Sequence, residues 1–92
     1  MRHHILVKWD TTQHRPELRA IDQLFQQTLE IPGIHSVSLH PNVVDRPNRY
    51  DLLILLCMER DALAAYDASE AHARWKAEYG ARIAQKAIFD CE

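Results

Sequence analysis

The chain has 92 residues, of which 47% are hydrophobic, and its formal net charge at pH 7 is −2. This length fits a single domain spanning residues 1–92, and the apolar fraction is typical of a globular protein, which argues against disorder. The charge balance lacks the basic footprint of a nucleic-acid-binding protein, and no run of like charges indicates a membrane-bound surface.

The N-terminus and the cysteines predict a cytoplasmic protein without a metal or cofactor. The apolar stretch at residues 5–7 is too short for a signal peptide, and Lys8 ends it. Cys57 and Cys91 form no C-x-x-C pair, so neither a zinc knuckle nor a redox motif is predicted. The histidines show no i, i+4 spacing of the kind that binds zinc from one helix.

The first half of the chain predicts a strand, a helix and a second strand. Residues 3–9 are short and rich in strand-forming side chains, and alternation places His3 and His4 on opposite faces. Pro16 suits the first turn of a helix, which carries apolar residues at helical spacing and ends near residue 30, before Pro32. Residues 34–40 alternate as a half-buried strand does, and breakers over 41–49 predict a loop.

The second half predicts a buried strand, helical segments and a final strand. Residues 50–58 contain the longest apolar run of the chain, which is far too short to span a bilayer but fits a strand buried on both faces. Helical composition follows over 59–66, and Ser69 can cap a further helix. One stripe of that helix carries His72, Trp75, Tyr79 and Ile83, and residues 84–91 alternate as the last strand.

The resulting order, β-α-β-β-α-β, is the ferredoxin-like arrangement, an α+β fold with one four-stranded antiparallel sheet and both helices on one face. The other face of this sheet is left open. Because the 52–58 run is apolar at every position, the open face is predicted to be apolar as well. Two such sheets stacked face to face would bury it, so we expect a homodimer.

Five segments in the right order resemble the stress-responsive dimeric α/β-barrel (Dabb) family. They are His3-His4-Ile5-Leu6-Val7-Lys8-Trp9, Ile31-Pro32-Gly33-Ile34, Tyr50-Asp51-Leu52, Tyr66 to His72, and Ile88-Phe89-Asp90-Cys91-Glu92. The resemblance covers nearly the whole chain. It implies a ferredoxin-like monomer, a dimer whose two sheets form an α/β barrel and, in some members, a pocket between sheet and helices.

The resemblance also implies candidate catalytic residues. Relatives of the olivetolic acid cyclase type close a polyketide ring by aldol condensation without a cofactor, and they carry a Tyr and a His that Tyr66 and His72 match in type and spacing. A first-strand histidine also lines the pocket in that type, and His3 is a better match than His4. The chain departs from the family at Ser69-Glu70-Ala71-His72, where a His and a Pro are replaced, and near His40-Pro41, where a Gly is replaced.

The physical case for this pair depends on a break in the helix. Six positions on an unbroken helix would leave Tyr66 and His72 roughly 120° apart, so they can share a site only if Ser69 starts a new helix. A histidine is suited to removing a proton at neutral pH, and a tyrosine hydroxyl can bind the resulting enolate oxygen. The competing interpretation is that Tyr66 packs on the sheet and His72 covers a turn, with His3 a hydrogen-bonded strand residue.

Three functions remain open from the sequence, and it does not decide whether the protein is an enzyme. The first is a pocket for a small carbonyl-containing or polyketide-like molecule, with cofactor-independent cyclase or lyase-like chemistry. The second is a non-catalytic stress-response protein that binds a ligand or partner. The third, by fold analogy alone, is a cofactor-free monooxygenase of the related dimeric barrels. None of them predicts a nucleic-acid or membrane partner.

Overall fold

The computed structural model describes all 92 residues and has the predicted element order. The helices and strands are β1 (Arg2–Trp9), α1 (Leu18–Gln26), β2 (Ile34–Pro41), β3 (Leu52–Met58), α2 (Ala62–Asp67), α3 (Glu70–Tyr79) and β4 (Ile83–Cys91). Two short 3₁₀ turns, Gln27–Glu30 and Gly80–Arg82, extend α1 and α3. No helix has both the length and the apolar character that crossing a membrane requires.

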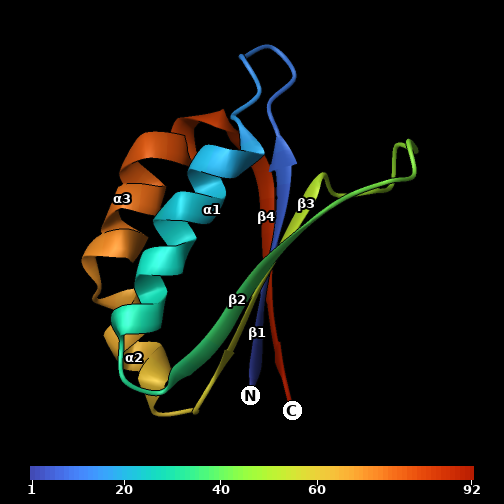
Figure 1. Cartoon of the computed structure of the whole chain (residues 1–92). Coiled ribbons are helices and arrows are strands. Elements are labelled where there is room, and N and C mark those ends of the chain that lie inside the picture. The colour runs from blue at the N-terminus through green and yellow to red at the C-terminus, as the bar shows by residue number, and fades with distance from the viewer.

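The four strands form one antiparallel sheet in the order β2-β3-β1-β4, with the helices together on one face (Figure 1). This confirms the ferredoxin-like prediction. The prediction was wrong at several boundaries. The first helix begins at Leu18 with Glu17 as its N-cap, so Pro16 lies before the helix and not in its first turn. The buried strand begins at Leu52 and not at residue 50. Ile83 does not continue the stripe of α3, because the helix stops at Tyr79 and the 3₁₀ turn then leads Ile83 into β4.

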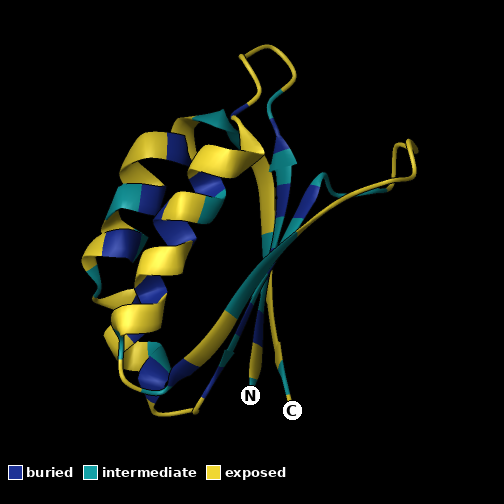
Figure 2. Cartoon of the chain, in the orientation of Figure 1, coloured by how far each residue is buried: buried dark blue, intermediate teal, exposed yellow.

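The core lies between the sheet and the helices. Alternate residues of β1 and β3 point into it, so that Val7, Ile54 and Leu56 are completely buried (Figure 2). Phe25 of α1 and Trp75 of α3 meet edge to face above them, with ring centroids 5.0 Å apart. Each such side chain contributes about 1.5–3 kcal/mol of burial free energy, so this layer is the main stabilising contact of the chain.

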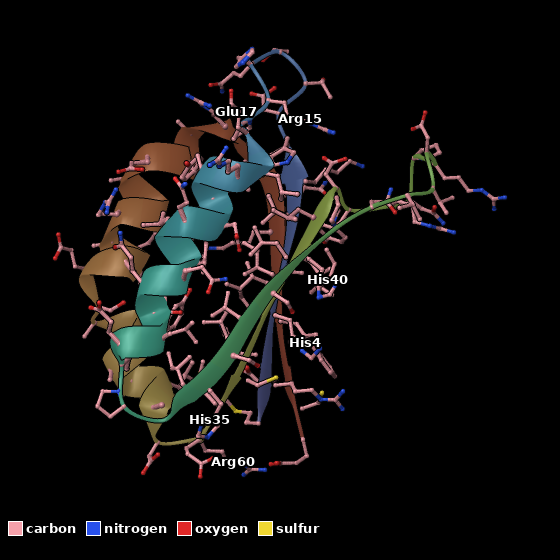
Figure 3. All side chains as sticks on the ribbon, in the orientation of Figure 1. His4, Arg15, Glu17, His35, His40 and Arg60 are labelled. Carbon is pink, nitrogen blue, oxygen red and sulfur yellow. The ribbon has the colours of Figure 1, made fainter.

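The opposite face of the sheet is uncovered. Leu6, Leu53 and Leu55 point to this side and are only half-buried, and Phe89 of β4 is 61% exposed. Figure 3 shows His4 and His40 on the same side, away from the helices. β3 is therefore buried on one face only within a single chain, and its second face has the apolar character that the sequence predicted.

Two local features fix the ends of these strands. The pairing of β1 with β4 is irregular between Lys8 and Trp9. At this point the Trp9 N–H donates to the Asp51 carboxylate at 2.8 Å, and the same carboxylate forms an ion pair with Arg15 at 3.1 Å. Gly33 joins the first helical segment to β2 with a φ of 92°. Only glycine adopts this conformation at little cost, which is why the Pro32-Gly33 pair ends the helix here.

Candidate functional site

A pocket of about 220 Å³ lies between the sheet and the second helical segment, at the β1–β4 side. It brings together all three predicted site residues, which come from β1, α2 and α3. The lining consists of His3, Ile5, Leu63, Tyr66, Asp67, His72, Trp75, Lys86, Ile88 and Asp90. Because the residues from β4 are exposed, the pocket is open to solvent along this edge.

The break in the helix that the sequence required is present at Ser69. α2 ends at Asp67, and the Ser69 hydroxyl caps α3 by accepting from the His72 N–H at 3.1 Å. The same hydroxyl donates to the Tyr66 carbonyl at 2.7 Å, which ties the two helices together. As a result the rings of Tyr66 and His72 lie side by side, with centroids 5.0 Å apart.

His72 is held in one tautomer by its own backbone turn. Its Nδ1 lies 2.9 Å from the carbonyl oxygen of Asp67. A carbonyl can only accept, so we assign the proton of the neutral ring to Nδ1, which leaves the Nε2 lone pair free. The side chain is half-exposed at the mouth of the pocket, where Nε2 is the atom that can take a proton.

Tyr66 forms the inner wall of the pocket and carries an unsatisfied hydroxyl. The residue is 1% exposed, and its buried hydroxyl oxygen has no hydrogen-bond partner. Burial, together with the nearby charge of Asp67, raises the pKa of Tyr66 well above its usual range, so the group is a proton donor and not a base. Leaving such a group unpaired costs about 1–3 kcal/mol, and no other buried side-chain nitrogen or oxygen of the chain lacks a partner.

His3 is the first-strand histidine that enters the pocket, and His4 is not. His3 is 5% exposed, its Nδ1 lies 2.6 Å from the Asp90 carboxylate, and its ring meets that of Tyr66 edge to face at 5.5 Å. His4 points to the open face, where its Nδ1 donates to the Phe89 carbonyl at 3.0 Å. The Asp90 contact places the His3 proton on Nδ1 and leaves Nε2 for a second partner.

Two charged residues of the pocket, Asp90 and Lys86, were not among the predicted site residues. Both lie at alternate positions of the predicted last strand and therefore share one face, but the sequence-based prediction did not pair that strand with β1. In a ferredoxin-like sheet the first and last strands are neighbours, and the observed register sets His3 opposite Asp90 and Val7 opposite Lys86. The topology together with the alternation therefore contained enough information to find them.

The pocket thus combines two imidazoles with free Nε2 atoms, one buried hydroxyl donor and an apolar wall. The apolar wall comes from Ile5, Trp75 and Ile88. Nowhere in the chain are three or more His, Cys, Asp or Glu side chains grouped so that they could hold a metal ion. The chemistry that these residues offer by themselves is proton transfer beside an apolar surface.

Comparison with known proteins identifies the fold. No family model and no curated protein matches the sequence. Among solved structures, a dimeric ferredoxin-like protein of unknown function from Jannaschia sp. CCS1 has a TM-score of 0.75 at 18% identity, covering 99% of this chain and 96% of that one. A Dabb family protein from Mesorhizobium loti has a TM-score of 0.63 at 9% identity, covering 99% and 93%. The chain has the fold of the Dabb family.

An enzyme with this fold is also among the similar structures. It is the hydroxynitrile lyase of Passiflora edulis, with a TM-score of 0.66 at 11% identity, covering 96% of this chain and 87% of that one. At these identities the likeness concerns the fold alone. The resemblance to the Dabb family that the sequence indicated is supported at this level, whereas the catalytic roles of His3, Tyr66 and His72 stay predictions.

Proposed function

We propose that the pocket binds a small carbonyl compound of polyketide-like type and that His72 removes a proton from a carbon next to a carbonyl. The observation that carries this proposal is the buried, unpaired hydroxyl of Tyr66, whose ring contacts the rings of both His3 and His72. An orphan donor in a core is costly, and a ligand oxygen would satisfy it.

The proposed chemistry needs no cofactor. His72 Nε2 takes the proton from a carbon flanked by two carbonyls, and the electron pair of the broken C–H bond moves onto the neighbouring oxygen as an enolate. Hydrogen bonding from Tyr66 stabilises this charge. The enolate carbon then attacks a second carbonyl of the same molecule, a C–C bond forms, and the proton on His72 passes to the new alkoxide. Run in reverse, the same steps cleave a C–C bond.

The protein is further proposed to act as a homodimer whose open sheet faces stack on each other. The half-buried leucines of β1 and β3 and the exposed Phe89 form an apolar surface that a second copy would cover. The structural relative from Jannaschia is described as dimeric, which supports this arrangement. In such a dimer each pocket remains accessible, because it lies on the helix side of its own sheet.

A second candidate function is binding without catalysis. Its support is the burial of the Tyr66 hydroxyl oxygen, which solvent does not reach in this conformation. A ligand would then occupy the half-open outer part of the pocket, beside His72, without contacting the donor that the enolate needs.

Proton exchange separates these two functions. The protein is mixed in D₂O with a 3-oxo ester such as ethyl 3-oxohexanoate, and deuterium uptake at the carbon between the two carbonyls is followed by NMR. For a general base, we expect His72→Ala to lower the enzymatic exchange rate by roughly 10²–10⁴-fold, and Tyr66→Phe to cost less. The matched control is His14→Ala, which changes an exposed loop histidine outside the pocket.

Each outcome selects one interpretation. Exchange above background that disappears with His72 supports the catalytic proposal. Ligand-induced shifts of the His72 resonances without any exchange support binding alone. Exchange that is unchanged in His72→Ala contradicts the assignment of the base.

A further inference from the structure

Charges of opposite sign lie at different positions along the pocket. Lys86, Ile88 and Asp90 alternate on one face of β4, opposite Val7, Ile5 and His3 of β1. At a rise of about 3.4 Å per residue, the Cα atoms of Lys86 and Asp90 lie about 14 Å apart. The proton-transfer residues lie near Asp90, and the lysine is separated from them by the apolar side chain of Ile88.

The two carboxylates of the pocket belong to the proton-transfer end. Asp90 is engaged by His3 at 2.6 Å, and Asp67 adjoins Tyr66 and accepts from His72 through its backbone carbonyl. Lys86, in contrast, makes no hydrogen bond and no ion pair with any side chain of the protein, although it lines the pocket. It is a cation that lacks a partner, at the end of an apolar wall.

We propose that Lys86 selects ligands that carry an anionic group, such as a carboxylate, separated from the reacting carbonyl by an apolar spacer. This inference rests on the proposed function, because it assigns the substrate class of the same pocket. The carbonyl lies at the Tyr66 end, the spacer lies on Ile5, Trp75 and Ile88, and the anion meets the Lys86 ammonium. A flexible oxo acid has this layout.

The simpler explanation for this lysine is protection of a sheet edge. β4 is an edge strand, and edge lysines commonly discourage pairing with other chains. That role requires only a charge at the edge, and it predicts that Lys86 has no effect on which ligands the pocket binds. The two explanations therefore differ in whether a ligand's affinity depends on its charge through Lys86.

Binding of three related probes tests the proposal on the full chain. The probes are 7-oxooctanoate, its primary amide and octanoate, titrated separately while the NMR resonances of pocket residues are followed. We expect the oxo acid to bind roughly fivefold more tightly than its amide, as a partly exposed charge pair allows. Lys86→Met should abolish that preference, and Lys86→Arg should keep it.

The matched control is Lys76→Met, which removes an exposed lysine of α3 outside the pocket and should leave the preference unchanged. Raising the salt concentration should reduce the preference in the wild-type protein, because the ammonium is solvent-exposed.

The outcomes keep the two proposals apart. If acid and amide bind equally, the role of Lys86 is refuted while the carbonyl pocket survives. If octanoate binds as tightly as the oxo acid and its affinity falls in Lys86→Met, the preference for anions is supported and the proposal that the pocket recognises a carbonyl group is refuted. A preference for the acid that persists in Lys86→Met overturns the inference, and the absence of pocket shifts with all three probes overturns both.

Discussion

Replacing Tyr66 by phenylalanine is expected to make the protein more stable. The substitution removes a buried hydroxyl that has no partner and keeps the ring, which packs against His3 and His72. The unpaired group costs about 1–3 kcal/mol, so the free energy of unfolding should rise by about 1 kcal/mol or more. For a domain of this size, each kcal/mol corresponds to roughly 4–8 °C in Tm.

Urea denaturation with linear extrapolation, together with a thermal scan at one fixed protein concentration, measures this change. Most Tyr→Phe changes in a core remove a hydrogen bond and destabilise, so the predicted sign is informative. The matched control is Tyr79→Phe, because the Tyr79 hydroxyl is not a buried orphan and its removal should change little. A loss of 1 kcal/mol or more in Tyr66→Phe would refute the reasoning, since it would mean that the hydroxyl is hydrogen-bonded.

Three further predictions concern the fold and its response to pH. Gly33→Ala should lower the Tm measured by thermal unfolding, because φ is 92° and the added Cβ would lie 3.0 Å from the Ala62 Cβ. Gly80→Ala is the control and should be tolerated, because a Cβ added there would have no heavy atom within 4 Å. Leu53→Asp on the open face should give a folded monomer, and Ile54→Asp in the core should prevent folding, as light scattering and circular dichroism would show. The free energy of unfolding should decline above about pH 10. Burial raises the pKa of Tyr66 in the folded state, so the unfolded chain loses the hydroxyl proton at lower pH than the folded chain does. The decline should be shallower in Tyr66→Phe, which lacks this hydroxyl.

The order of elements could be predicted from the sequence because local signals agree with the topology. Pro16, Pro32 and Gly33 bracket the first helical segment, and Ser69 caps α3 as expected from its side chain. The end of α3 could not be predicted in the same way. Ile83 has the right spacing for the helix stripe, and only the tertiary path of the chain decides that the residue begins a strand instead.

The candidate site was predictable to the extent that it depends on single elements. Alternation separated His3 from His4, and the need for a helix break at Ser69 explained how Tyr66 could meet His72. The contacts of Asp90 and Lys86 with the pocket depend on the pairing of the first and last strands, which no local pattern encodes and which follows only from the ferredoxin-like order of the whole chain. The unpaired state of the Tyr66 hydroxyl depends on the positions of all neighbouring atoms, which no sequence pattern specifies.

The position of the pocket follows from how far the helices reach across the sheet. On the helix side, the residues of β1 and β3 are buried, whereas Lys86, Ile88 and Asp90 of β4 are exposed although they point to the same side. The helix layer therefore stops short of β4, and the uncovered strip beside His3 becomes the wall of an open pocket. A charged and an apolar side chain can both be kept on this strip because it is exposed to solvent, whereas the hydroxyl oxygen of Tyr66 is buried and has no hydrogen-bond partner. The incomplete coverage of β4 thus produces the accessible mouth, and the burial of Tyr66 beside it leaves the unpaired hydroxyl on which the proposed chemistry depends.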